Sequence, residues 1–207
     1  MLTRRQFSTG TLGLGGALAF AGRVRAAGGK EIEPGANGLY TQPWFLESFL
    51  ELSDDLSEAA GKGKNFAVIW EQKGCPYCRE THRVNFADER ISSYITANFE
   101  LLQLDLWGSR KVTDFDGKEM EERELAQRWN VVFTPTIMFF PADPAAVEGK
   151  DGRKAEVVRM PGYFRPFHFL TMFEYVRGRK YEDLAFQKYL QQKFAELQAK
   201  GISPDVW

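Results

Sequence analysis

The chain contains two cysteines, and their spacing points to redox chemistry. They stand in the run Cys75-Pro76-Tyr77-Cys78, and the sequence has no other cysteine. A disulfide between them would close a loop of only a few residues, for which the chain-entropy formula gives about 2 kcal/mol of stabilisation. A purely structural role therefore explains the pair poorly. We interpret it as a dithiol that forms and breaks a disulfide during function.

The residues around the cysteines predict a strand, a sharp turn and a helix. The apolar, partly β-branched run 66–70 is typical of a strand that is buried on both faces. Lys73-Gly74 interrupts this run, and Pro76 suits the first turn of a helix because that position needs no amide proton. One long helix is expected to follow. Its buried face would contain Val84, Phe86, Ile91, Tyr94 and Ile95.

This placement assigns different roles to the two sulfurs. Cys75 would lie at the helix N-terminus, where free amide groups and the helix dipole stabilise a thiolate, so we expect it to be the nucleophile with the lower pKa. Cys78 would lie one turn inside the helix. It is better shielded there and can attack a mixed disulfide to release the bound partner. Cys75 and Cys78 are therefore the predicted catalytic residues.

The remaining pattern predicts an α/β fold with a central mixed sheet flanked by helices. A second strand (99–104) and a second helix (119–129) follow the first pair and complete a βαβ unit. Two further strands, 136–140 and 156–160, are joined by a polar loop, which suggests an antiparallel hairpin. A helix at about 165–176 then gives the order βαβ followed by ββα.

Extra helices are expected at both ends of this core. The first, 43–60, would start near Pro43 and end before Gly61. The second, 184–197, is amphipathic and is expected to pack on the domain, with a dimer interface as the alternative. The buried face of the first helix would contain Phe45, Phe49, Leu52 and Leu56.

The first 26 residues predict an export signal. Arg4-Arg5 precedes an uncharged apolar stretch at 10–22, and Ala26 provides the small residue at which a signal peptidase cuts. The apolar stretch is interrupted by glycines and is shorter than the roughly 20 residues that span a bilayer. We therefore expect a twin-arginine-type signal peptide at 1–26, cleavage after Ala26 and a periplasmic location.

Cleavage would change both the charge and the length of the protein. The segment 1–26 holds four arginines and no acid, so the basic residues fall from 27 to 23 against 28 acidic ones, a net charge of −5. Such a charge argues against a nucleic-acid partner. The 181 residues that remain, 207 minus 26, suit one domain. We expect a linker at 27–42, the domain at 43–200 and a C-terminal tail at 201–207.

These elements and motifs resemble the thioredoxin superfamily. The resemblance rests on the Cys-Pro-Tyr-Cys motif and on Thr134-Pro135, which precedes the third strand where thioredoxins carry a cis-proline that faces the disulfide. It implies a thioredoxin-like fold that needs no cofactor. It also implies that the substrate binds against Pro76, Tyr77, Thr134 and Pro135.

Several sequence blocks are more closely similar to the SoxW-type thioredoxins of bacterial sulfur oxidation. The blocks are 71–78, 84–88, 105–110, 133–136 and 161–163. The resemblance implies a periplasmic reductant of exported thiol proteins, sulfur-oxidation components among them. A membrane thiol-disulfide donor would supply its electrons.

The sequence departs from cytoplasmic thioredoxin in two respects. The dipeptide between the cysteines is Pro-Tyr, whereas cytoplasmic thioredoxin has Gly-Pro. The buried aspartate six residues before the first cysteine is replaced by Ile69. Glu71 lies two residues later and would face the same side of the sheet, so it is a candidate to accept the Cys78 proton; solvation at the sheet end is the alternative. His82, one turn beyond Cys78, is expected to be a solvated helix residue, with tuning of the thiolates as its alternative.

Three classes of function remain open, together with the role of one loop. A reductant or carrier competes with an oxidant or isomerase of the DsbA or DsbC kind, because proteins with such a motif act in either direction. A metal carrier using Cys75, Cys78 and His82 is weakened by the presence of only two histidines.

The loop 107–118 is either a partner-recognition loop or a neutral insertion, and its Asp-x-Asp-Gly run is too short for an EF-hand.

Overall fold

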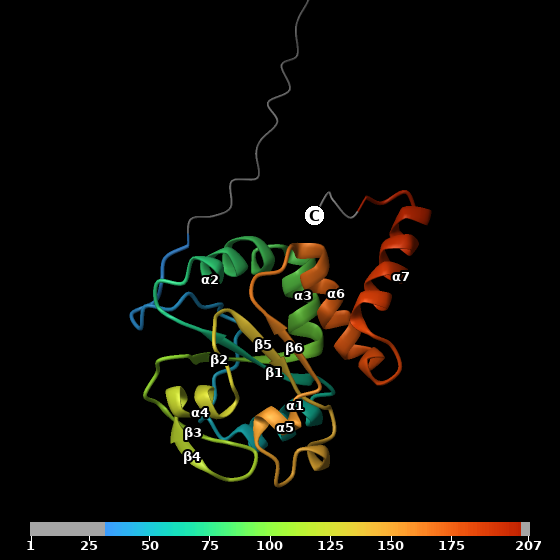
Figure 1. The fold of residues 1–207 in the computed structure, drawn as a ribbon. Coiled ribbons are helices and arrows are strands. Elements are labelled where there is room, and N and C mark those ends of the chain that lie inside the picture. The colour runs from blue at the N-terminus through green and yellow to red at the C-terminus, as the bar shows by residue number, and fades with distance from the viewer. Residues whose placement is uncertain (1–31, 204–207) are drawn as a thin grey trace, which may run out of the picture.

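The central sheet has four strands in the order β2-β1-β5-β6. In the computed structural model, which describes residues 32–203, β1 runs parallel to β2 and antiparallel to β5, and β6 is antiparallel to β5 (Figure 1). The predicted order βαβ followed by ββα is thus confirmed. The predicted signal peptide, 1–26, lies outside the described residues. The strands are β1 Asn65–Glu71, β2 Phe99–Asp105, β5 Thr136–Phe139 and β6 Val158–Pro161.

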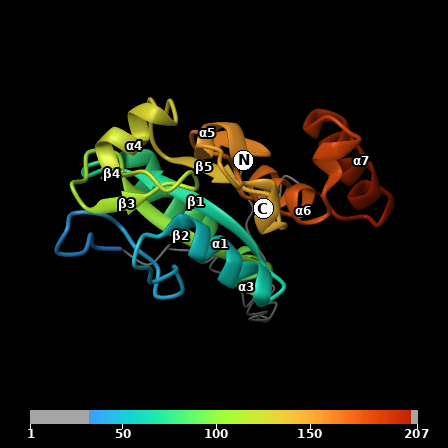
Figure 2. The ribbon, with the colours of Figure 1, turned by 90° about the horizontal axis from the view of Figure 1, so that it is seen from below.

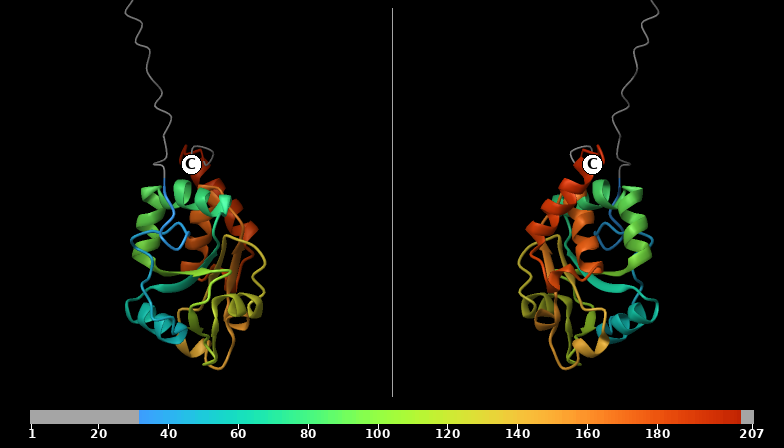
Figure 3. Two further views of the ribbon diagram at one scale, coloured as in Figure 1. Left: turned by 90° about the vertical axis from the view of Figure 1, so that its left-hand side faces the viewer. Right: turned by 90° about the vertical axis from the view of Figure 1, so that its right-hand side faces the viewer.

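Helices cover both faces of the sheet, so β1 is buried along its whole length (Figures 1 and 3). Phe66, Val68 and Trp70 belong to one core cluster, which they share with α1, α4 and α5. Ala67 and Ile69 point to the opposite face and belong to the other cluster, with α3 and α6. The continuous apolar run therefore indicates a strand between two layers. These helices are α1 Leu52–Gly61, α3 Glu89–Asn98, α4 Glu122–Arg128, α5 Gly152–Ala155 and α6 Pro166–Arg177.

The helix after the cysteines is divided into three parts, whereas the sequence pattern predicted a single long one. A short α-helix, α2 Pro76–Glu80, continues as a π-helical segment, Thr81–Phe86. The chain then leaves the helical conformation at Asp88, whose carboxylate accepts a hydrogen bond from the amide of Arg90 at 2.9 Å. This N-cap starts α3 in a new direction.

The N-terminal helix is shorter than predicted, because the chain turns before it. Leu50 has a φ of 67°, a left-handed conformation that cannot continue a helix. Phe49 is fully exposed. Phe45 packs in the core cluster on the opposite face of the sheet from the cluster that contains Leu52. The helix therefore covers Leu52–Gly61, with Gly61 as its last residue and not the residue after its end.

Two short strands occupy a region where loop and helix were predicted. β3 Lys111–Thr113 and β4 Glu119–Glu121 form an antiparallel hairpin, and α4 starts only after it. The hairpin could not be recognised because its strands have three residues each, with a single apolar residue in each strand. Similarly, α5 lies in the predicted polar loop, and the fourth strand begins at Val158 instead of 156.

The C-terminal helix α7, Phe186–Ala199, packs only lightly on the domain. The ring of Tyr175 in α6 lies 5.4 Å from the rings of Phe186 and Tyr189, and Lys193 of α7 pairs with Glu174 of α6 at 2.9 Å. No residue of α7 is fully buried, and the helix projects from the side of the molecule (Figures 1 and 2). Within residues 32–203, no helix is long and apolar enough to cross a membrane. Two 3-10 turns, Pro144–Ala146 and Lys180–Glu182, complete the element list.

Candidate active site

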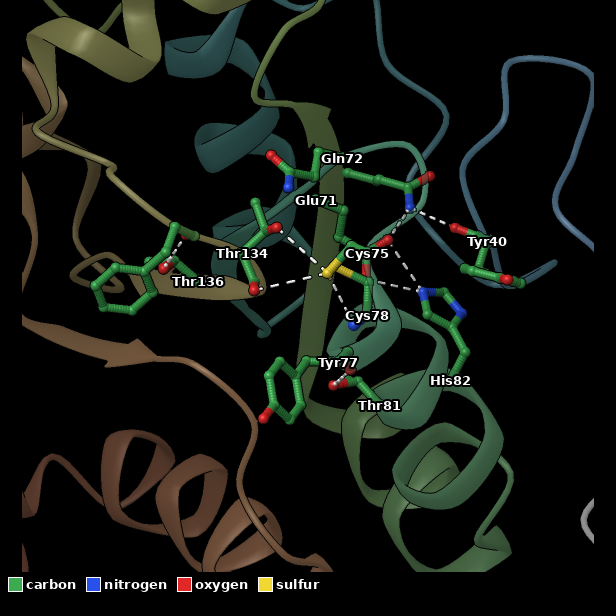
Figure 4. Close-up of a disulfide and its surroundings, with 12 residues drawn as sticks. Tyr40, Glu71, Gln72, Cys75, Tyr77, Cys78, Thr81, His82, Thr134 and Thr136 are labelled. Atoms are coloured by element: carbon green, nitrogen blue, oxygen red, sulfur yellow. Dashed lines mark hydrogen bonds and ion pairs between the residues drawn. A yellow bond between two sulfur atoms is a disulfide. The ribbon is translucent and has the colours of Figure 1, made fainter.

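Cys75 and Cys78 form a disulfide at the N-terminus of α2 (Figure 4). Cys75 is the N-cap residue, and its Sγ accepts a hydrogen bond from the backbone amide of Cys78 at 3.0 Å. Pro76 occupies the first helical turn. The sulfur of the predicted nucleophile thus lies among free amides at the positive end of the helix, where a thiolate is stabilised.

The segment Thr134-Pro135 lies against the disulfide, although 59 residues separate Thr134 from Cys75. The peptide bond between Thr134 and Pro135 is cis. The hydroxyl of Thr134 donates to Sγ of Cys75 at 3.3 Å, and the Thr134 carbonyl oxygen lies 3.6 Å from the same sulfur. The structure therefore brings together Cys75, Cys78 and Thr134, as the sequence motifs indicated.

Exposed apolar side chains gather around the disulfide and form what we call the apolar rim. Tyr77 is 61% exposed between the two cysteines, and Val132 and Phe133 are 70% and 50% exposed just before Thr134. Trp107, 68% exposed, donates its indole N–H to Gln72 Oε1 at 2.9 Å and so stands beside the segment that leads into Cys75. Among the described residues only Phe49 and Ile202 are other large apolar side chains with comparable exposure. The rim members are Tyr77, Trp107, Val132 and Phe133.

Tyr163 was not recognised as a site residue beforehand. Its ring stacks on that of Tyr77, with centroids 6.4 Å apart and planes inclined by 22°. The loop that carries Tyr163 is held by Asn85, whose side-chain amide donates to the Phe164 carbonyl at 2.9 Å. Burial raises the pKa of Tyr163, so its hydroxyl stays neutral at neutral pH.

Glu71 and His82 form a buried pair, which corrects the expectation that His82 is solvated and excludes solvation for Glu71. Their exposed fractions are 0% and 1%, and Nε2 of His82 lies 3.0 and 3.1 Å from the two carboxylate oxygens of Glu71. The pairing depends on the tertiary fold, because the helix carries His82 back over the end of β1. Helical periodicity predicts on which face of the helix His82 lies, but it cannot predict which other parts of the fold cover that face.

Three residues outside the predicted site complete the surroundings of this pair. Gln103 of β2 donates its side-chain amide to Glu71 and also to the Tyr40 carbonyl oxygen, the latter at 2.6 Å. The side-chain amide of Gln42 lies 3.0 Å from Nδ1 of His82. Gln42 and Tyr40 belong to the segment expected to be a linker, 27–42, whose described part also contains the buried Leu39. A glutamine between the apolar residues Leu102 and Leu104 of the strand was the available signal for Gln103.

The loop 107–118 folds back on the domain by means of its acidic residues. Asp114 is buried and accepts hydrogen bonds from the Trp129 indole and the Gly152 amide, each at 3.0 Å. Arg128 pairs with both Asp114 and Asp116. Burial raises the pKa of Asp114, and the hydrogen bond from Arg128 lowers the pKa of Asp116. These carboxylates therefore hold the loop in place. Separately, within residues 32–203 no group of three His, Cys, Asp or Glu residues is arranged for a metal ion.

Comparison with known proteins agrees with this geometry. Residues 52–177 match the family model of the thioredoxin-like domain, so the chain belongs to that family. It is 27% identical over 158 residues to the thiol:disulfide interchange protein DsbD of Ralstonia nicotianae. That match covers 76% of this chain but only 22% of the relative.

Comparison with solved structures gives further similar proteins. One is a thioredoxin-fold protein from Helicobacter pylori, with 25% identity, a TM-score of 0.46 and coverage of 65% of this chain and 81% of that one. Another is the C-terminal domain of Neisseria meningitidis DsbD in the oxidised form, with 12% identity, a TM-score of 0.41 and coverage of 59% and 87%. Family and site together define the protein as a thioredoxin-like protein whose Cys75–Cys78 disulfide lies at the N-terminus of a helix.

Proposed function

We propose that this protein is a periplasmic thioredoxin-like reductant that donates electrons to disulfides of exported proteins. The observation that carries the proposal is the position of Cys75, at a helix N-terminus, against Thr134 and within the apolar rim. A sulfur in such surroundings suits attack on a protein disulfide whose flanking residues are apolar.

The reaction has two exchange steps. In the first, the thiolate of Cys75 attacks one sulfur of the substrate disulfide; a mixed disulfide forms, and the other substrate sulfur leaves with its electron pair as a thiolate. In the second, Cys78 loses its proton and attacks Sγ of Cys75, which releases the second substrate thiolate. The substrate gains two electrons, and the protein ends with the Cys75–Cys78 disulfide.

The expected export signal supports the compartment. A dithiol delivered to an oxidising compartment needs a source of electrons, which a membrane thiol-disulfide donor would provide. The similarity to part of a thiol:disulfide interchange protein is consistent with exchange between such partners. The sequence blocks shared with SoxW-type thioredoxins support sulfur-oxidation components as one group of substrates.

The apolar rim supports a protein as substrate. Exposed side chains such as Trp107 and Phe133 can bury apolar area against residues that flank a cysteine, which a small thiol compound does not offer. Pro76 and Tyr77 on one side and Thr134 and Pro135 on the other would then border the substrate sulfur.

Trapping of mixed disulfides in cells tests the proposal. Cys78→Ser removes the resolving thiol, so complexes with Cys75 should accumulate and can be identified after purification under non-reducing conditions. The matched control, Cys75→Ser with Cys78→Ser, should trap nothing. Exported proteins with cysteines are the expected partners. Trapping of cytoplasmic proteins alone, or of none, would contradict the proposed function.

A further inference from the structure

The buried pair of Glu71 and His82 lies behind the disulfide and has no part in the exchange steps as written above. Figure 4 shows the Glu71 side chain running from the end of β1 toward the helical region after the turn, in which Cys78 lies in α2 and His82 in the π-helical segment Thr81–Phe86 that follows. Cys78 is 1% exposed, so water cannot readily take the proton that it must lose in the second step. Some buried group has to accept that proton.

The hydrogen bonds around His82 determine which of its nitrogens carries a proton. The side-chain amide nitrogen of Gln42 lies 3.0 Å from Nδ1, and an amide NH₂ can only donate. Nδ1 must therefore accept, which leaves the imidazole proton on Nε2. That N–H faces both oxygens of Glu71, at 3.0 and 3.1 Å. His82 thus acts as a neutral donor to the Glu71 carboxylate.

The orientation of the Glu71 carboxyl group is consequently set from two sides. It accepts hydrogen bonds from His82 and from Gln103, and neither donor has to give up its own proton. Two donors compensate part of the cost of burying a charge, and a carboxylate keeps lone pairs free for a third partner. Two other titratable groups lie beside the pair: Tyr40, whose ring centroid is 6.0 Å from that of His82, and Asp105, the register partner of Glu71 on β2.

We propose that His82, in the tautomer fixed by Gln42, is a positioning residue that orients Glu71 to accept the proton of Cys78. This inference rests on the proposed roles of Cys75 as nucleophile and Cys78 as resolving thiol, and it holds for either direction of electron flow. When the second step occurs, the proton passes from Cys78 to Glu71, and the Cys78–Cys75 sulfur bond forms. The bond between Cys75 and the partner sulfur breaks, and its electron pair leaves with the partner.

The two-step reaction of the reduced protein with dithiobis-nitrobenzoate tests the inference. Each exchange step releases one coloured thiolate, so the first release reports attack by Cys75 and the second reports attack by Cys78. Glu71→Gln and His82→Phe should leave the first release nearly unchanged and slow the second by about tenfold or more, because a general base is lost. The second rate should recover as the pH rises toward about 8.5, where a free thiol ionises unaided.

Three further variants separate positioning from a merely structural role. His82→Gln keeps an N–H donor for Glu71 and should restore most of the second rate. Glu71→Gln combined with His82→Phe should be no slower than Glu71→Gln alone, because His82 works through Glu71. Gln42→Leu changes a half-buried position and should also slow the second release, which gives a test even if His82→Phe does not fold.

Specific outcomes would overturn the inference. The first is an unchanged rate of the second release in His82→Phe or, if that variant does not fold, in Gln42→Leu. The second is an equal slowing of both releases. The third is a loss of rate in the double variant that equals the sum of the losses in the two single variants. None of them bears on whether exported proteins are the substrates, which the trapping experiment decides separately. Conversely, failure to trap exported partners would leave the two release rates, and this inference, standing.

Discussion

The hydroxyl of Thr134 donates a hydrogen bond to Sγ of Cys75 at 3.3 Å, in addition to the bond at 3.0 Å from the Cys78 amide. Both donors would remain when the disulfide is reduced and Cys75 carries a negative charge. A hydrogen bond to the charged form of a group stabilises that form. The cis Thr134–Pro135 segment therefore contributes to the reactivity of the nucleophile as well as to the shape of the site.

Thr134→Val removes this donor while it preserves the shape of the side chain. The pKa of Cys75 in the reduced protein should rise by about one unit, since a hydrogen bond to a charged group contributes about 1.5–3 kcal/mol. The measurement is the pH dependence of the Cys75 alkylation rate. Thr134→Ser keeps the hydroxyl and should behave like the parent protein. Identical profiles for the valine variant and the parent would refute the role of the hydroxyl.

The two cysteines should differ in reactivity. Because Cys75 is at the helix N-terminus and Cys78 is inside the helix, iodoacetamide should modify Cys75 faster at neutral pH. Mass spectrometry of partially alkylated, reduced protein measures the ratio. Cys75→Ser should abolish insulin disulfide reduction. Equal rates, or faster modification of Cys78, would reverse the assignment of nucleophile and resolving thiol.

Trp107 should contribute to the recognition of protein substrates. Trp107→Ala is expected to slow insulin reduction by about tenfold, which corresponds to about 1.4 kcal/mol of lost contact energy, because the apolar rim loses its largest member. The first step with dithiobis-nitrobenzoate should be unaffected, since a small disulfide does not reach the rim. Phe49→Ala removes another exposed aromatic residue as a control. Equal losses with both disulfides would argue against a docking role.

Much of the active site follows from the sequence because the signals are local. The apolar run that ends at Trp70, the glycine turn and Pro76 fix the position of Cys75 on their own. The pairing of Glu71 with His82 is not local in this sense, because it depends on how the π-helical segment after α2 packs over β1. Sequence periodicity locates both residues correctly and still leaves their burial undetermined.

The errors at the ends of elements also have physical causes. Residues 43–50 have the spacing of an amphipathic helix, but the amide of Leu50 bonds to the Ser48 hydroxyl at 2.6 Å, and the segment turns instead. Side-chain bonds to the backbone compete with a helix in this way. The β3-β4 hairpin escaped prediction because each strand has only three residues with one apolar residue at its centre, which is too short to reveal a period of two.

The burial of Asp55 predicts a pH dependence of stability. Burial raises the pKa of Asp55 to about 6, so the protonated form is favoured in the folded state. The associated stabilisation is present below the unfolded pKa of about 4 and is lost as the pH rises through about 6. At neutral pH, the ionised Asp55 therefore destabilises the fold relative to a neutral side chain.

Asp55→Asn should consequently increase the free energy of unfolding at about pH 7.5 and have little effect at about pH 4. The expected gain is about 1 kcal/mol, because the carboxyl keeps some contact with solvent. Asn can still accept the hydrogen bond from Ser48, which donates to Asp55 at 2.6 Å. Urea unfolding at the two pH values measures the difference, with the exposed neighbour in Asp54→Asn as control. A gain of the same size at both pH values would contradict the assignment.

The reduction potential of the Cys75–Cys78 disulfide tests the central claim, that the protein is a reductant, most directly. A glutathione titration should give a value nearer thioredoxin's, about −270 mV, than DsbA's, about −120 mV. At about 1.4 kcal/mol for each 30 mV, the two roles differ by about 7 kcal/mol in the relative stability of dithiol and disulfide. We predict a value close to that of thioredoxin. A potential more oxidising than about −170 mV would contradict the account and identify the protein as a thiol oxidant.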